Sequence, residues 1–177
     1  MKKILYFIFY IYFFLFVVEA SVKEYTIKND TLFIQLPEII ERVLDNDVII
    51  YFEDEYYEML SSIDIFSFDV EMTKNVTFVG REGGTVFHYN EDKQGSIKVF
   101  FKSEKGKKFT IKNIIFDNFI ENFGVSAINV FSYVSEFFVE IINCTFRNNL
   151  SPSIRIRKHY SKALMNTENV LIDNCKF

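Results

Sequence analysis

Tryptophan is absent from this chain of 177 residues, and glycine (6) and proline (2) are scarce. Their scarcity excludes collagen-like chains and the disordered classes that are rich in these two residues. Cysteine (2) and histidine (2) are also few, so a metal site is not expected, and nothing in the sequence indicates a cofactor. The net charge of −4 comes without any long stretch dominated by Lys and Arg, so nucleic acid is not an expected partner.

Apolar and aromatic residues are plentiful instead. Hydrophobic residues make up 49% of the chain and aromatic residues 18%, with 22 Phe and 10 Tyr. A chain of this length can fill the core of one domain with such material. We therefore expect a single folded domain.

Residues 1–20 are predicted to be a signal peptide. Lys2 and Lys3 precede an apolar run at positions 4–18, and Val18 and Ala20 are small residues of the kind that a signal peptidase reads. The run is shorter than the roughly 20 apolar residues that span a bilayer, which favours cleavage over an uncleaved anchor. Residues 21–177 are then expected to be secreted or held at the cell surface, with no transmembrane span.

An eight-residue pattern occurs three times, at positions 109–116 (FTIKNIIF), 139–146 (VEIINCTF) and 170–177 (VLIDNCKF). The spacing of about 30 residues is typical of a solenoid, in which each repeat buries its apolar face only by stacking on its neighbours. A second strand pattern alternates with the first, at 96–100 (SIKVF), 127–131 (AINVF) and 153–157 (SIRIR). With the short piece after each Asn, these patterns predict three parallel strands per coil.

A short helix is expected before the first coil. Apolar residues recur at helical spacing over residues 36–44, behind Pro37, and Asp45 ends the pattern. Solenoids need such a segment because it covers the open apolar end of the first coil. We therefore predict a capping helix at 36–44 in the domain 21–177.

Four segments are also distinctive: PEIIERVLDNDVIIYFEDEYYEM, NVTFVGREGGTVF, GVSAINV and CTFRNN. The first two are similar to the N-terminal cap and first coil of the right-handed parallel β-helix proteins of the pectin-lyase-like superfamily, which the chain resembles. The last two resemble repeats of polymorphic outer-membrane surface adhesins. The resemblance covers about residues 31–177 and implies an all-β fold with right-handed coils.

Two residue types recur at fixed places in the repeat. Asn tolerates the left-handed backbone region that a sharp corner needs, and its amide can bond the Asn of the next coil in a ladder. Phe is expected to stack in the core, where each buried ring stabilises the fold by about 1.5–3 kcal/mol. The predicted ladder contains Asn75, Asn113, Asn143 and Asn174, and the predicted aromatic column contains Phe78, Phe116, Phe146 and Phe177.

Four triplets match the N-glycosylation pattern, at Asn29, Asn75, Asn143 and Asn149. A glycan on Asn75 or Asn143 would compete with the predicted ladder. Asn29, before the first expected strand, and Asn149, in an expected loop, are therefore the better acceptors in a glycosylating host.

Cys144 and Cys175 occupy the same place in successive repeats, where other rungs are expected to carry Val76 and Ile114. Adjacent parallel strands lie about 4.8 Å apart, within the Cα range of disulfides, and the secretory route is oxidising. Two parallel Cβ vectors nevertheless have to twist to reach the torsion of a disulfide. A disulfide and a pair of buried free thiols both remain open, while His88 and His159 are expected to have no partner in their columns.

The outward positions of the second strand type supply the candidate binding residues. They are basic or aromatic, with no carboxylate among them: Lys98, Phe100, Asn129, Phe131, Arg155 and Arg157. The acidic run at 53–58 is interpreted as a solvated edge. Hydrolysis of a polysaccharide requires carboxylates held at fixed separation, so no enzymatic activity is expected.

Two classes of function are therefore considered. The first is a non-catalytic, adhesin-like or structural protein of the surface, with glycans or surface components as partners. The alternative is a carbohydrate-binding or polysaccharide-degrading module, similar to pectate lyases, that acts on an anionic glycan. Because Phe177 belongs to an incomplete coil, we also expect a truncated chain whose open C-terminal coil self-associates.

Overall fold

The computed structural model describes residues 22–28, 35–43, 46–59, 66–89, 95–120, 126–159 and 169–177. The predicted signal peptide at 1–20 and the candidate acceptor Asn29 lie outside these ranges.

The described strands form three all-parallel sheets. Sheet A contains β1 (Val22–Ile27), β2 (Asp47–Phe52), β5 (Val76–Val79), β8 (Lys107–Lys112), β11 (Phe137–Ile142) and β14 (Val170–Asp173), in that order. Sheet B contains β3 (Tyr56–Glu58), β6 (Thr85–His88), β9 (Ile114–Asp117) and β12 (Thr145–Arg147), and sheet C contains β4 (Phe66–Glu71), β7 (Gly95–Phe101), β10 (Ile128–Ser132) and β13 (Ile154–Lys158).

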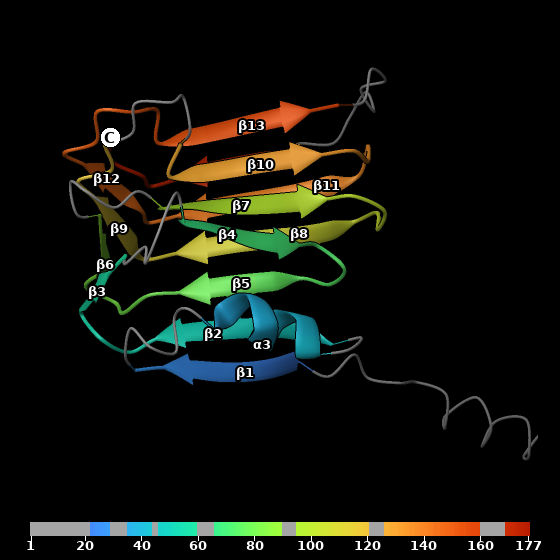
Figure 1. Cartoon of the computed structure of the whole chain (residues 1–177), viewed down its shortest axis with the longest axis horizontal. Coiled ribbons are helices and arrows are strands. Elements are labelled where there is room, and N and C mark those ends of the chain that lie inside the picture. The colour runs from blue at the N-terminus through green and yellow to red at the C-terminus, as the bar shows by residue number, and fades with distance from the viewer. Residues whose placement is uncertain are drawn as a thin grey trace, which may run out of the picture.

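Each coil takes one strand from every sheet, in the order A, B, C. Successive coils are β2–β3–β4, β5–β6–β7, β8–β9–β10 and β11–β12–β13, followed by β14. In Figure 1, sheet A and sheet C form the two long walls with opposite strand directions, and sheet B closes one side. The chain climbs through them in a right-handed sense. The predicted parallel β-helix with three strands per coil is confirmed.

The interior is filled by columns of side chains from equivalent positions. On sheet B the column contains Tyr57, Phe87, Phe116 and Phe146, whose strands pair in register. The Phe116 and Phe146 rings stack at 4.9 Å and 4°, and Phe146 stacks on Phe177 at 5.1 Å. The first four rings are almost completely buried, so this column is a continuous part of the core.

The predicted aromatic column was wrong at Phe78, and Phe177 has its predicted place in the column but is not buried. Phe78 lies on sheet A, where it pairs in register with Ile111 and packs edge-on against Phe52 and Phe109. Phe177 does stack on the column, but it is 75% exposed because no described coil lies above it.

An asparagine ladder turns the chain from sheet A into sheet B. Asn113, Asn143 and Asn174 all have positive φ, at 57°, 53° and 49°. The Asn143 amide donates to Asn113 Oδ1 at 3.3 Å, and the Asn174 amide donates to Asn143 Oδ1 at 2.7 Å. The ladder predicted from the sequence is confirmed at these three residues.

Asn75 is not part of this ladder, so its predicted place was wrong. It precedes β5 at the opposite end of sheet A, where its amide donates to Asp47 at 2.9 Å and its Oδ1 accepts from the Lys108 N–H. The ladder position in that coil is held by Gly80, which follows β5 and donates to the Lys112 carbonyl. A longer turn with Gly84 at φ 94° then leads into β6.

A second pair of asparagines turns the chain from sheet B into sheet C, and the sequence analysis did not predict it. Asn118 and Asn148 follow β9 and β12 directly and have φ values of 64° and 57°. Asn118 donates from its amide to the Tyr89 carbonyl at 2.8 Å. Left-handed asparagines therefore bound the strands β9 and β12 on both sides.

The helix α3 (Leu36–Arg42) closes the N-terminal end of the core. It packs beside β4, where the next strand of sheet C would lie, and buries Leu36 and Ile40 (Figure 1). Lys74, itself buried, donates from Nζ to the carbonyls of Ile40 and Val43 and so satisfies the C-terminal end of the helix. The predicted capping helix is confirmed, although β1, which extends sheet A below it, was not predicted.

Candidate functional site

The outer face of sheet C carries rows of side chains from β7, β10 and β13. Strand pairing aligns the strands residue by residue, and inward positions such as Ile97 and Val130 are fully buried. The backbone bonds Tyr133 N to Phe101 O and His159 N to Ser132 O continue the same alignment past the strand ends. The rows are Lys98–Asn129–Arg155, Phe100–Phe131–Arg157 and Lys102–Tyr133–His159, and we refer to these nine residues as the sheet C platform.

The aromatic rings of the platform stack on one another. Phe100 and Phe131 are 5.0 Å apart at 11°, and the Arg157 guanidinium lies 5.7 Å from the Phe131 ring. Tyr133 and His159 stack at 4.6 Å and 5°. Because the ring faces are covered by neighbours, the rings order the charged groups and offer mainly their edges to solvent.

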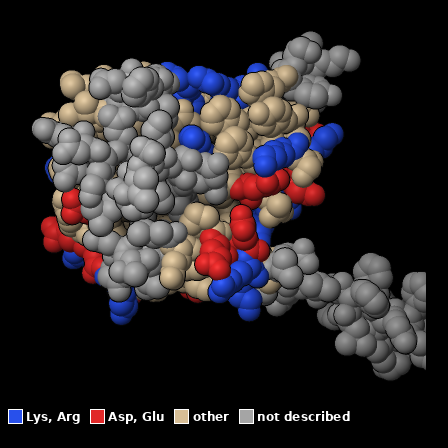
Figure 2. Space-filling view, viewed as in Figure 1, with Lys and Arg blue, Asp and Glu red and all other residues tan. Residues whose placement is uncertain are grey.

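The charge of this face changes along the solenoid axis. Lys102 sits 5.6 Å above the Phe100 ring and pairs with Glu71 of β4 at 2.7 Å. Within the described part of the chain, neither Arg155 nor Arg157 of β13 forms an ion pair. In Figure 2, basic side chains line the upper edge of this view, where β13 lies, whereas acidic and basic side chains are mixed at mid-height and below. Two cations without an ion pair in the described part of the chain therefore lie at the β13 end of this face.

All six predicted binding residues lie in these rows, but Asn129 is not available to a ligand. Asn129 is only 3% exposed, and its amide donates to the Ser126 carbonyl at 2.6 Å. Asn129 aligns with the outward residues Lys98 and Arg155, as predicted, but its side-chain amide is hydrogen-bonded within the protein. The additional members, Lys102, Tyr133 and His159, continue the same alternation two residues beyond each predicted segment, which is the signal that would have found them.

A row of alternating charge crosses the outer face of sheet B. Glu58, His88, Asp117 and Arg147 are paired in register on successive strands. His88 Nδ1 lies 3.0 Å from Asp117 Oδ2, and Arg147 Nε donates to Asp117 Oδ1 at 2.9 Å. The expectation that His88 has no partner in its column was therefore wrong.

Asp117 is the centre of that row. Burial would raise the pKa of this carboxyl, but hydrogen bonds from Arg147, His88 and Asn148 outweigh the burial and hold its pKa below its usual value. Both carboxylate oxygens accept hydrogen bonds, the Asn148 amide donating at 2.9 Å. A carboxylate fixed in this way stays ionised and is poorly suited to act as a general acid. The signal in the sequence was the charged residue that follows each column aromatic.

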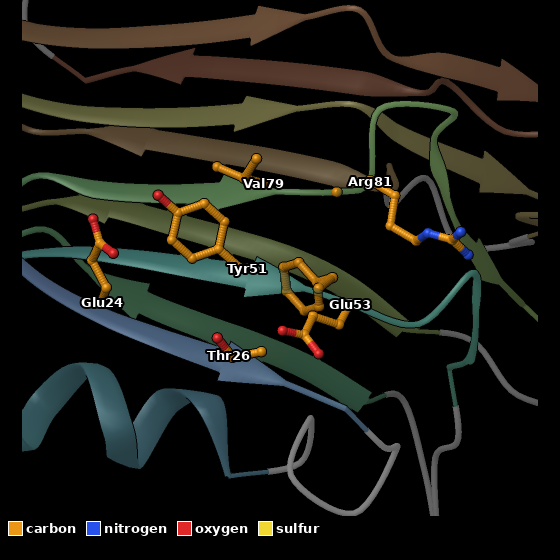
Figure 3. Close-up of a pocket in the computed structure, with 8 residues that line it drawn as sticks. Glu24, Thr26, Tyr51, Glu53, Val79 and Arg81 are labelled. Atoms are coloured by element: carbon orange, nitrogen blue, oxygen red, sulfur yellow. The ribbon is translucent and has the colours of Figure 1, made fainter.

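A hollow of about 770 Å³ lies on the outer face of sheet A (Figure 3). Glu24 and Thr26 project into it from β1, and Tyr51 from β2. Glu53, at its rim, pairs with Lys28 at 3.1 Å, and Arg81 pairs with Glu55 at 3.5 Å. The exposed carboxylates make this hollow unfavourable for an anionic ligand.

The predicted glycosylation acceptors are mostly engaged by the protein. The amide of Asn149, expected to be free in a loop, donates to the Phe116 carbonyl, and its Oδ1 accepts from Phe119 N at 2.7 Å. Asn75 and Asn143 are held by the contacts described above. Since a glycan needs a free amide nitrogen, these three contacts oppose modification of the folded chain.

Cys144 and Cys175 are free thiols in this structure. Cys144 is buried, and burial raises the pKa of its thiol to about 12. Thr85 and Ile114 precede the two cysteines in their column, so the expected place of Val76 was wrong. In the described ranges, no group of three or more His, Cys, Asp or Glu side chains is arranged to hold a metal ion.

Comparison with protein-family models, with curated proteins and with solved structures finds no match for this chain. Among the described residues, no helix is long and apolar enough to cross a membrane. The outer faces of the sheets therefore supply the observations on which a function can be proposed.

Proposed function

We propose that this protein is a non-catalytic β-helix protein of the extracellular space or the cell surface that binds an anionic glycan through the sheet C platform. The observation that supports this most is the set of cationic side chains on one sheet face, with Lys98 on β7 and Arg155 and Arg157 on β13, the second strand along the sheet. Adjacent strands are about 4.8 Å apart, so β7 and β13 are about 9.6 Å apart. A linear polyanion that lies along the solenoid axis therefore meets cations from two coils, with the Phe131 ring between them.

The stacked rings hold a cationic group of the platform in position. Phe100, Phe131 and Arg157 form one continuous stack, so the guanidinium is held in place before a ligand arrives. Preorganisation of this kind reduces the conformational entropy lost on binding. Within the described parts of β7, β10 and β13, no outward position carries a carboxylate that would oppose the ligand.

Export is supported by the N-terminal segment. Lys2 and Lys3, the apolar run at 4–18 and the small residue Ala20 together have the order of a signal peptide. The solenoid fold and the adhesin-like segments agree with a location at the cell surface, and membership of the pectin-lyase-like superfamily is part of the same proposal.

Cleavage of the glycan is the second candidate, favoured by the His88–Asp117 contact on sheet B. Its weakness is that both oxygens of Asp117 are already bonded, and that the row lies on a different face from the platform. We therefore propose binding without cleavage.

The test is a binding titration of residues 21–177 against polygalacturonate, with a neutral galactan as the control polymer. We expect saturable binding to the anionic polymer that weakens as salt is added, and little binding to the neutral one. Absorbance of unsaturated uronides and new reducing ends are measured in the same samples. Equal binding to both polymers would contradict the platform as the site, and released products would contradict the non-catalytic proposal.

Self-association through the C-terminal coil is a further part of the proposal. The coil that contains β14 exposes Ile172 (44%) and Phe177 (75%), and a hollow of about 760 Å³ lies beside Phe146 and Leu150. Open strand edges next to apolar side chains favour pairing with another chain. Sedimentation of residues 21–177 over a wide concentration range is expected to show concentration-dependent association, and a monomer throughout would contradict it.

A further inference from the structure

The thiols of Cys144 and Cys175 lie in one column on successive coils. The neighbouring residues Thr145 and Lys176 form a parallel bridge, which places the two cysteines directly opposite each other. The sulfurs also make equivalent hydrogen bonds. Cys144 Sγ donates to the carbonyls of Ile142 (3.4 Å) and Ile111 (3.7 Å), and Cys175 Sγ donates to those of Asp173 (3.3 Å) and Ile141 (3.4 Å).

Equivalent hydrogen bonds mean that the side chains point in the same direction. Their sulfur atoms are then separated by about one strand spacing, roughly 4.8 Å. A disulfide bond is about 2.05 Å long and needs a torsion near 90° between the two Cβ–S bonds. Formation of that bond would require one of the side chains to leave its present rotamer.

A metal ion between the sulfurs needs much less movement. Bonds from thiolate sulfur to a metal ion are about 2.3 Å long in zinc sites, so two such bonds in line span about 4.6 Å. A linear site with only two ligands does not suit zinc, which is tetrahedral, but it suits the soft ion Cu(I), which thiolates select. The absence of a third ligand within the described residues agrees with such an ion.

The two thiols differ in their exposure to solvent. Cys144 is fully buried below Cys175, next to Ile114 in the same column. Cys175 is only partly buried, because no described coil lies above it. An ion can therefore reach Cys175 from solvent and be shielded once Cys144 also binds.

We propose that Cys144 and Cys175 form a two-coordinate site for Cu(I) that joins the last two coils. One Cu(I) ion replaces the protons of the two thiols, so two S–H bonds break, two Cu–S bonds form and two protons are released. No electron is transferred, and the complex carries one negative charge. This site is independent of the sheet C platform and of glycan binding.

The test is a competition titration of the reduced protein with Cu(I) held by a chromophoric chelator, under argon. We expect the wild-type chain to remove one equivalent of Cu(I), and the Cys175→Ser and Cys144→Ala variants each to lose at least tenfold in affinity. Circular dichroism establishes that each variant is folded, and Cys175→Ser is the decisive one because its position is partly exposed. Its own control is the same titration with Zn(II), which we expect not to bind at comparable concentration.

Retention of wild-type Cu(I) affinity by Cys175→Ser would overturn the proposal. A wild-type chain that binds no Cu(I) would also overturn it. Mass spectrometry of the copper-free protein in a glutathione buffer supplies the remaining test, since we expect both thiols to stay reduced. Rapid loss of two hydrogens would show that the sulfurs reach bonding distance, and would contradict the geometry on which the site depends.

Discussion

Among the described residues, five asparagines adopt the left-handed backbone conformation, and every one of them lies at a corner of a coil. In that conformation the Cβ of an L-residue lies too close to a carbonyl oxygen, at a cost of roughly 1–2 kcal/mol, and Asn is tolerated because its short polar side chain can form local hydrogen bonds. The corner after β5 is different, because Gly80 stands there with Asn113 of the next coil directly above it. A Cβ on Gly80 would lie 2.1 Å from the Asn113 carbonyl oxygen.

We therefore predict that Gly80→Ala destabilises the fold by about 1–3 kcal/mol, since two backbone segments must move apart. Gly83→Ala is the matched control in the same turn, because nothing lies within 4 Å of a Cβ placed there. The free energies of unfolding come from urea titrations of the two variants and the wild type. Equal stability of the two variants would contradict the close approach of Gly80 and Asn113.

Asp117 gives a prediction about pH. Since its pKa is lowered by folding, the unfolded state takes up the proton first as the pH falls, so the stabilisation is full above about pH 4 and is lost below it. Asp117→Asn should cost on the order of 2 kcal/mol at pH 7, where it removes hydrogen bonds from charged partners. The difference between variant and wild type should shrink towards pH 2.5. A difference that is constant with pH would show that the charge of Asp117 contributes nothing.

At the scale of elements, the contact between Lys74 and α3 determines how the N-terminal end of the solenoid is closed. The Nζ of Lys74 meets the last carbonyls of the helix, where a positive charge is favourable. Lys74 is 5% exposed, so its removal would leave buried carbonyls without a donor.

Lys74→Met should therefore destabilise the protein by about 1–3 kcal/mol and open α3 locally. Amide hydrogen exchange should show faster exchange in α3 than in β8 or β11. The comparison variant is Arg42→Met, which removes the exposed ion pair to Glu38 and should cost less than about 0.5 kcal/mol. Similar exchange rates in both variants would mean that the helix does not depend on Lys74.

The three-strand coil could be predicted because its corner residues recur at a regular spacing in the sequence. Asn113, Asn143 and Asn174 recur with the same neighbours, and each single-residue corner fixes the register of the strands on both sides. The prediction failed at Asn75 and Phe78 because the same letters occur there at the start of a strand. That coil turns through a longer, glycine-containing segment, so aligning its residues with the later repeats by residue type placed them in the wrong register.

The residues of the candidate surfaces could be predicted only where the alternation of inward and outward side chains along a strand identifies the exposed ones. Lys98, Phe100, Phe131, Arg155 and Arg157 follow directly from the parity of their strands. The burial of Asn129 depends on packing outside its own strand, which the alternation does not encode. The row through Asp117 was missed because its members belong to strands of only three or four residues, and the corners that end two of them, Asn118 and Asn148, were not recognised.

At the scale of the whole molecule, the two long walls differ in charge. The outer face of sheet A carries the exposed carboxylates Glu24 and Glu53 around its hollow, whereas the β13 end of sheet C carries Arg155 and Arg157. A net charge of −4 therefore does not prevent binding of a polyanion, because the local potential directs the ligand to one wall.

The most direct measurement is the affinity for polygalacturonate of the double variant Arg155→Gln/Arg157→Gln, compared with Lys105→Gln/Lys112→Gln. Both variants lose two positive charges, but only the first loses them from the platform. We predict at least about a tenfold loss of affinity and a weaker salt dependence for the first variant, with less than about a twofold change for the second. Equal losses in both variants, or unchanged binding by the first, would contradict glycan binding at sheet C.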